Sequence, residues 1–137
     1  MQTRGSPHRP VPFPFLQLDL GGELSAARRA RQELRGCCRH LGVDEDACDV
    51  VLLLSSELVT NAVLHGAPPV HLDAGFDGAR VHLAVSDADP HHPVERAWDP
   101  TALGGRGVQL LRDLSEAWGV DVHADGKTVW CRVRLRS

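Results

Sequence analysis

The longest stretch without a helix-breaking residue runs over residues 45–65, and it constrains the fold more than any other feature of the sequence. This stretch contains no glycine or proline and many residues that favour a helix. Asp44 can cap its first turn, Gly66 follows its last turn, and Pro68 and Pro69 prevent the helix from continuing. The sequence therefore predicts one long helix.

Two further segments show helical periodicity. In residues 26–41, apolar residues recur at three- and four-residue steps, with Ser25 at the N-cap position and Gly42 after the end. The arginines of this segment fall on its outer face. A shorter apolar stripe begins after Gly107 and predicts a third helix that ends near Gly119. This stripe consists of Val108, Leu111, Leu114, Ala117 and Trp118.

Alternating apolar residues predict about five strands. The first runs from Phe13 to the glycines at 21 and 22, and two pairs follow that are joined by hairpin signals, Asp77-Gly78 and Asp125-Gly126. Elements with a single apolar face are most economically buried in two layers. The predicted class is α+β, a two-layer sandwich in which one mixed, mostly antiparallel sheet is covered on one face by about three helices.

Length and composition indicate a single globular domain. The chain has 137 residues, of which 42% are hydrophobic and 24% charged, and residues 1–12 carry three prolines without any period. We therefore expect a tail over residues 1–12 and one domain over residues 13–137. The net charge of -3 does not favour direct nucleic-acid binding. No apolar run reaches about 20 residues and the start does not resemble a signal peptide, so we expect a soluble, cytoplasmic protein without a membrane segment.

The four cysteines do not have the spacing of a zinc site, because no Cys-x-x-Cys pair occurs and the eight histidines form no ligand set beside them. We expect buried, reduced thiols, which suit a reducing compartment.

A row of polar residues interrupts the apolar surface of the long helix. Glu57, Asn61 and His65 follow one another at four-residue steps, about 6 Å apart along the axis. A carboxylate and an amide oxygen at this spacing suit Mg²⁺ bound to phosphate, with the carboxylate available as a base. An exposed polar stripe with ordinary contacts between successive turns is the alternative.

Three further features could contact a bound ligand. The segment Gly104-Gly105-Arg106-Gly107 directly precedes a helix, where backbone N–H groups and a guanidinium can bind phosphate, although a hinge explains it as well. It is neither a Walker A loop nor a Rossmann turn. Asp87 ends an apolar strand and can accept a hydrogen bond from an amino group, or form a turn. Thr128 can supply a hydroxyl, or simply leave a hairpin.

These four features, in this order, resemble the GHKL (Bergerat-fold) ATPases, and within them the small anti-sigma factor serine/threonine kinases. Residues 57–66 resemble the N-box, Asp87 stands at the start of the first glycine box, residues 104–107 match the second, and residues 126–130 resemble the third. The first glycine box commonly reads Asp-x-Gly-x-Gly, and this chain departs from it with Asp87-Ala88-Asp89-Pro90-His91. The connection up to Gly104 is short and proline-rich, so any lid is small.

The resemblance implies a role for each motif. Asn61 would coordinate Mg²⁺ on the triphosphate of ATP, and Glu57 would orient and deprotonate an attacking hydroxyl. Asp87 would bind the adenine amino group, supported by Thr128. The phosphates would be enclosed by Gly104, Gly105, Arg106, Gly107 and Val108.

The resemblance also implies a function. The leading hypothesis is an ATP-dependent serine/threonine protein kinase that phosphorylates an anti-anti-sigma-type antagonist and can sequester a sigma factor. A nucleotide-gated protein-binding module with little or no phosphotransfer is the alternative. A sensor histidine kinase fragment is disfavoured, because no helix pair with an acceptor histidine precedes the domain, and an α+β domain that binds no nucleotide stays open. A homodimer is also open, with Trp130 and the arginines on its strand face as the candidate contact.

Overall fold

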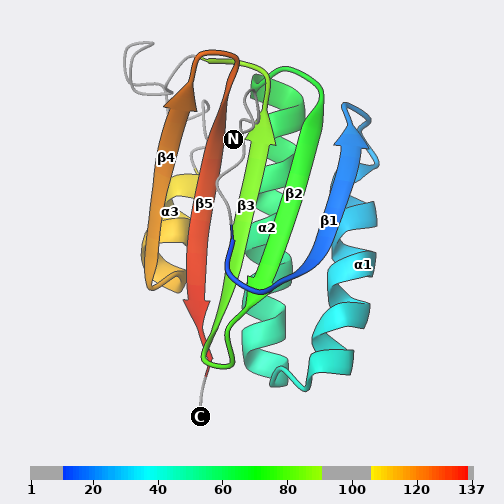
Figure 1. Cartoon of the computed structure of the whole chain (residues 1–137), viewed down its shortest axis with the longest axis vertical. Coiled ribbons are helices and arrows are strands. Elements are labelled where there is room, and N and C mark those ends of the chain that lie inside the picture. Colours follow the sequence, from blue (N-terminus) through cyan, green and yellow to red (C-terminus); the bar gives the residue numbers. More distant parts are fainter. Residues whose placement is uncertain (1–10, 91–105, 136–137) are drawn as a thin grey trace.

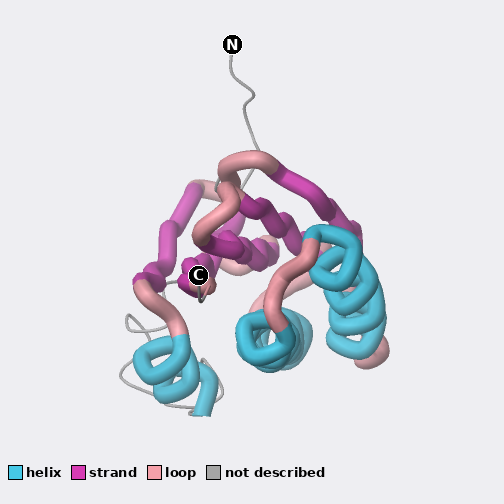
Figure 2. Tube along the Cα trace, turned by 90° about the horizontal axis from the view of Figure 1, so that it is seen from below, coloured by secondary structure: helices cyan, strands magenta, loops and turns pink. Residues whose placement is uncertain are grey.

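The computed structural model describes residues 11–90 and 106–135, which form a five-stranded sheet with three helices on one of its faces (Figures 1 and 2). This arrangement confirms the predicted two-layer α+β class. The helices are α1 (Ala26–Leu41), α2 (Glu45–His65) and α3 (Arg106–Leu114). The strands are β1 (Pro14–Gly21), β2 (Val70–Phe76), β3 (Arg80–Asp87), β4 (Ala117–His123) and β5 (Gly126–Arg134).

The strands lie in the order β1-β2-β3-β5-β4, and every neighbouring pair is antiparallel. The expected mixed sheet is therefore antiparallel throughout among the strands described. The strands β3 and β4, which flank the chain segment containing α3, do run in the same direction, but β5 lies between them and pairs with both. This order brings the carboxyl end of β3 next to the start of β5, with Asp87 opposite Lys127.

Helix α2 supplies a large part of the core. Its buried side chains face the sheet and α1, and Val51, Leu54 and Val59 have no exposed surface. By length and composition alone, α2 could cross a membrane, but 56% of its most apolar window is buried inside the domain. Burial in a protein core accounts for this composition.

The two long helices begin differently. Asp44 caps α2 as predicted, because its carboxylate accepts a hydrogen bond from the N–H of Ala47 at 3.0 Å. Ser25 precedes α1, but its side chain makes no capping hydrogen bond, which corrects the expectation that it caps this helix. Its backbone is already helical, and a cap requires an extended conformation. Gly42 ends α1 in the left-handed conformation (φ 75°), as its sequence position indicates.

Helix α3 is shorter than predicted. It ends at Leu114, and Ala117 and Trp118 belong to β4 rather than to the helix. These two residues fit both a helical and an alternating pattern of apolar residues. Pairing with β5 favours the strand. Trp118 lies opposite Cys131, and Glu116 donates its N–H to the carbonyl of Arg132 at 2.8 Å.

The predicted tail and the proline-rich connection fall largely outside the described residues. Of the tail, Val11 and Pro12 are described, and Pro12 lies directly over Gly75, where a Cβ atom would overlap its carbonyl. The neighbouring Phe13 accepts a hydrogen bond from the N–H of Phe76 at 3.1 Å. The segment just before β1 therefore packs on the face of the sheet opposite the helices.

Candidate functional site

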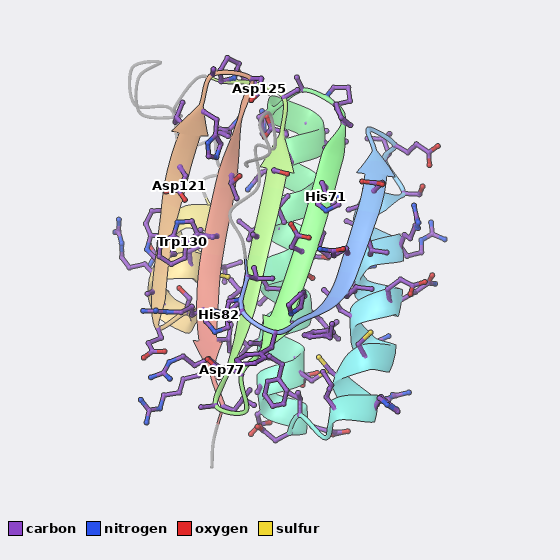
Figure 3. All side chains as sticks on the ribbon, in the orientation of Figure 1. His71, Asp77, His82, Asp121, Asp125 and Trp130 are labelled. Carbon is purple, nitrogen blue, oxygen red and sulfur yellow. The ribbon has the colours of Figure 1, made fainter. Side chains whose placement is uncertain are left out.

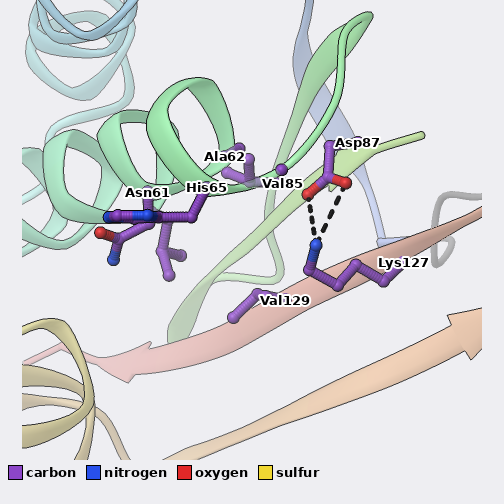
Figure 4. Close-up of a pocket in the computed structure, with 9 residues that line it drawn as sticks. Asn61, Ala62, His65, Val85, Asp87, Lys127 and Val129 are labelled. Carbon is purple, nitrogen blue, oxygen red and sulfur yellow. Dashed lines mark hydrogen bonds and ion pairs between the residues drawn. The ribbon is translucent and has the colours of Figure 1, made fainter. Parts of the chain in front are cut away.

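A pocket lies where the end of α2 meets the carboxyl end of β3 and the beginning of β5 (Figure 4). Apolar side chains from all three elements form most of its wall, and polar groups project from α2, β3 and β5. The lining residues are Leu58, Asn61, Ala62, His65, Gly66, Val85, Asp87, Lys127 and Val129. Two of the predicted site residues, Asn61 and Asp87, thus lie in the same pocket.

The Asn61 side chain is a buried polar group whose amide nitrogen has no partner in the part of the chain that the structure describes. The residue is only 7% exposed, and its Nδ2 has no hydrogen-bond partner among the described residues. An unsatisfied buried amide is costly, and functional sites are where such groups are retained. Because this carboxamide borders the pocket, a ligand can supply the missing partner.

The other two members of the polar row on α2 lie differently. Glu57 is half-buried, one turn before Asn61, and does not line the pocket. His65 lines the pocket from the last turn of α2 and is exposed. The row therefore runs along one side of α2 towards the pocket, with Asn61 as its buried member.

Asp87 is held at the end of β3 by a set of donors. It is 3% exposed, and its Oδ1 accepts hydrogen bonds from the N–H of Asp89 at 2.7 Å and of Ala67 at 3.4 Å. The carboxylate also touches Gly66, at which a Cβ atom would lie 2.5 Å from Asp87 Cγ. The glycine after α2 therefore permits this close approach.

Lys127 forms a buried ion pair with Asp87, which the sequence analysis did not anticipate. Its Nζ lies 3.2 Å from Oδ1 and 3.1 Å from Oδ2 of Asp87, and the lysine is 6% exposed (Figure 4). Strand alternation gave a signal for it, because Lys127 shares its face with the apolar residues Val129 and Cys131. A lysine in the apolar series of a strand needs a buried partner.

Thr128 is not among the residues that line the pocket. It pairs with Ser86 on one side and Asp121 on the other, and alternation along β5 places it on the face opposite Lys127. The structure therefore gives the place beside Asp87 to Lys127, one residue before the threonine expected there.

A family comparison gives this pocket its context. The model of the histidine kinase-like ATPase domain matches residues 21–133, which includes all the pocket residues. The chain belongs to the histidine kinase-like ATPase family. Membership confirms the resemblance to the GHKL ATPases and assigns ATP as the ligand of the domain.

The ATPase fold is also shared with a solved structure, that of the RsbU and RsbW domains of Rv1364c from Mycobacterium tuberculosis. The two are 27% identical in sequence, with a TM-score of 0.69 over 93% of this chain. The match covers 34% of the other chain, so this protein spans about a third of its length. No curated protein matches the sequence.

The segment predicted to be the second glycine box, residues 104–107, is described only in part. Helix α3 begins at Arg106, as expected for a helix that directly follows the glycines. Gly104 and Gly105 lie outside the described residues, and for Arg106, Gly107 and Val108 only their place in the first turn of α3 is known.

The residues that line the pocket fit a magnesium-nucleotide better than a metal held by protein alone. Within residues 11–90 and 106–135, no group of three histidine, cysteine or acidic side chains is placed to hold a metal ion. Mg²⁺ commonly takes one or two protein oxygens and completes its shell with water and substrate phosphates. Asn61 borders the pocket, where its Oδ1 can supply one such oxygen and its unpartnered Nδ2 can donate to a phosphate oxygen of the ligand.

The face of the sheet opposite the helices is polar (Figure 3). His71 on β2 lies 2.6 Å from Asp19 and 3.1 Å from Asp73, and these contacts raise the pKa of His71, with the Asp73 hydrogen bond as the largest cause. At one end of the face, His82 lies 2.9 Å from Asp77, and this hydrogen bond is the main cause of the lowered pKa of Asp77. These groups are not among the residues that line the pocket.

Proposed function

We propose that this chain is an ATP-binding anti-sigma regulatory factor with serine/threonine protein kinase activity. It phosphorylates an anti-anti-sigma-type antagonist and sequesters a sigma factor in the cytoplasm. The observation that carries the proposal is the buried side chain of Asn61, which borders the pocket one turn after Glu57 on the same helix and whose Nδ2 has no hydrogen-bond partner among the described residues. The likeness to a structure that contains an RsbW domain supports the regulatory assignment.

The residues of the chain divide the chemistry between them. The apolar walls and Asp87 bind the base, and the oxygen of Asn61 would hold the Mg²⁺ of the nucleotide. Mg²⁺, when bound, neutralises the charge that develops on the transferred phosphoryl group. Glu57 orients the serine or threonine hydroxyl of the partner and accepts its proton as the hydroxyl oxygen bonds to the γ-phosphorus and ADP leaves. Positioning and charge neutralisation supply most of the acceleration in such a transfer, so these few groups suffice.

Phosphotransfer and nucleotide binding can be tested separately. Purified chain is incubated with labelled Mg-ATP and candidate anti-anti-sigma proteins, and ATP binding is measured by calorimetry. We expect Glu57→Ala to keep ATP affinity within about threefold and to lose transfer by at least about a hundredfold, the usual contribution of a general base. Asp49→Ala, at an exposed acidic residue of the same helix, is the matched control and should behave as wild type.

Asn61→Ala tests the metal role. We expect the Mg²⁺-dependent part of ATP binding to be lost, while Thr60→Ala, at the exposed neighbouring position, retains it. Mg²⁺-dependent binding that is unchanged by Asn61→Ala would contradict the assignment.

The alternative is a nucleotide-gated binding module without phosphotransfer. It is favoured by the ion pair that already engages Asp87 and by the absence of glycine from residues 88–91, where the first glycine box commonly has two glycines. In that case, wild type and Glu57→Ala would bind the partner equally in an ATP-dependent manner, and neither would transfer phosphate.

A further inference from the structure

We infer that Lys127 reads the nucleobase jointly with Asp87, so that the pocket recognises a 6-aminopurine through a paired donor and acceptor. The inference rests on the ATP site of the proposed function and adds a specificity-determining residue to it. It starts from the buried contact between these two side chains at the pocket wall.

The Asp87 carboxylate retains an acceptor site. Its Oδ1 receives the N–H groups of Ala67 and Asp89 as well as the lysine ammonium. Its Oδ2 is approached by Lys127 at 3.1 Å, and among the described residues no other donor to it is found. Because a carboxylate oxygen has two lone pairs, Oδ2 can accept one further hydrogen bond from a ligand.

The Lys127 ammonium retains a donor. It carries three protons, and the two oxygens of Asp87 engage at most two of them. The nearest oxygen of Asp89 is 3.8 Å away, which is beyond hydrogen-bond distance. Lys127 lines the pocket and is almost fully buried, so a ligand in the pocket is the available acceptor for the remaining proton.

A 6-aminopurine matches this pair. Its amino group donates, and the adjacent ring nitrogen N1 accepts, so the amino group can bind Asp87 while N1 binds Lys127. Guanine presents the reverse order on this edge, a carbonyl acceptor beside an N–H donor. The flat ring faces suit the apolar wall that Leu58, Val85 and Val129 provide.

The pair also suits the charge of the ligand. A lone buried aspartate would repel the triphosphate and would require a partner of its own. With Lys127 beside it, the Asp87 carboxylate has a counter-charge within hydrogen-bond distance at the base-reading end of the pocket, and the Asp89 carboxylate lies 3.8 Å from the same ammonium group.

The decisive reagent is 1-deaza-ATP, in which a C–H group replaces N1. Calorimetric titration of the full chain with Mg²⁺ complexes should show that ATP binds at least about tenfold more tightly than 1-deaza-ATP, since a hydrogen bond from a charged donor is worth at least this factor. GTP should bind at least about tenfold more weakly than ATP. In Lys127→Met, the ratio of the ATP and 1-deaza-ATP affinities should approach one.

Removing the lysine alone leaves a buried, unpaired carboxylate that can unfold the protein. A second comparison avoids the unpaired carboxylate: the reference is Asp87→Asn, in which Asp89 at 3.8 Å remains as a counter-charge to Lys127, and the test is Asp87→Asn/Lys127→Met. The ATP to 1-deaza-ATP ratio should persist in the single variant and vanish in the double variant. Arg134→Met, which removes an exposed charge from the same strand, should leave the ratio unchanged.

Three results would overturn the inference: equal affinity of wild type for ATP and 1-deaza-ATP, GTP binding as tight as ATP binding, or tighter ATP binding by the double variant than by Asp87→Asn. The last result would mean that the lysine occupies the position of the base. A wild-type chain that binds none of these nucleotides would contradict the ATP site itself, whereas ATP binding with no discrimination contradicts the role of Lys127 alone.

Discussion

Gly66 and Asp87 lie so close together that no side chain fits between them. A Cβ atom on Gly66 would lie 2.5 Å from both Cγ and Oδ2 of Asp87 and 2.8 Å from the carbonyl oxygen of Ala62. The backbone of Gly66 is extended (φ -97°), so its conformation is open to any residue. Residue 66 must therefore be glycine because there is no space for a side chain. The position of the Asp87 carboxylate at the pocket depends on this space.

Gly66→Ala should displace Asp87, destabilise the domain by about 1–3 kcal/mol through overpacking, and weaken ATP binding. Thermal unfolding and ATP titration would measure the two effects. The matched control is Gly36→Ala, inside α1, where an added Cβ meets nothing within 4 Å. That substitution should raise stability by about 0.5–1 kcal/mol and leave ATP affinity unchanged. Unaltered ATP binding by Gly66→Ala would show that the carboxylate can move without consequence.

Leu34→Ala should cost about 2–5 kcal/mol, because this side chain of α1 is fully buried in the core. Leu24→Ala removes the same atoms from a side chain that is 83% exposed and should change the free energy of unfolding by less than about 0.5 kcal/mol. Urea denaturation measures both. Similar losses for the two variants would contradict the packing of α1 against α2 and the sheet.

Asp44→Ala should destabilise the protein by about 1 kcal/mol, because it removes the hydrogen bond that caps α2. Ser25→Ala should have little effect, because the Ser25 hydroxyl does not cap α1. Urea denaturation measures the loss of stability in both variants. Equal losses would contradict the finding that Asp44 caps its helix and Ser25 does not.

The thiols should differ in reactivity. Burial raises the pKa of Cys38 and of Cys131 to about 12, so at pH 8 only roughly one in 10,000 of these groups is ionised. Cys37, on the same helix as Cys38, is the partly exposed cysteine of the four. Titration of the native protein with a disulfide reagent should show one reacting thiol, and the unfolded protein should show four. If a thiol of native Cys37→Ser still reacts, at least one of the other three cysteines is accessible, which would contradict their burial in the structure.

The stability of the sheet should depend on the protonation of His71. Hydrogen bonds that His71 donates to Asp73 and Asp19 raise its pKa in the folded state. Its contribution to stability is therefore fully present below the unfolded value of about 6.5 and is lost as the pH rises through the folded pKa. His71→Gln should therefore cost more at pH 6 than at pH 9, by on the order of 1 kcal/mol or less. Asp73→Asn should reduce the same pH dependence, and a His71→Gln cost that does not vary with pH would exclude the mechanism.

Local signals made most of the fold predictable. The absence of glycine and proline between Asp44 and Gly66 predicted α2, and the Asp-Gly pair at Asp77 predicted the hairpin of β2 and β3. The end of α3 was not predictable in this way, because Ala117 and Trp118 satisfy both periods and their pairing partner lies on β5. Only tertiary pairing selects the strand.

The site residues likewise comprise some that local sequence predicts and one that it does not. Asn61 and Asp87 each stand out locally, as a polar residue in an apolar helix and as an acid at a strand end. Lys127 was not predicted, because its contact with Asp87 depends on the register between β3 and β5, which places the two residues opposite each other. That register is also what separates Lys127 from Thr128, since neighbouring residues of a strand face opposite ways.

Helix α2 carries Asn61 and also a large part of the core. Substitutions on α2 are therefore constrained both by the pocket and by the packing of the core. Lineages that adapt to a new nucleotide or lose catalysis have little freedom to do so on α2, where most exchanges also threaten folding. The ends of β3 and β5 bring Asp87 and Lys127 to the same cavity, and drift in ligand preference is therefore expected to accumulate at those strand ends first.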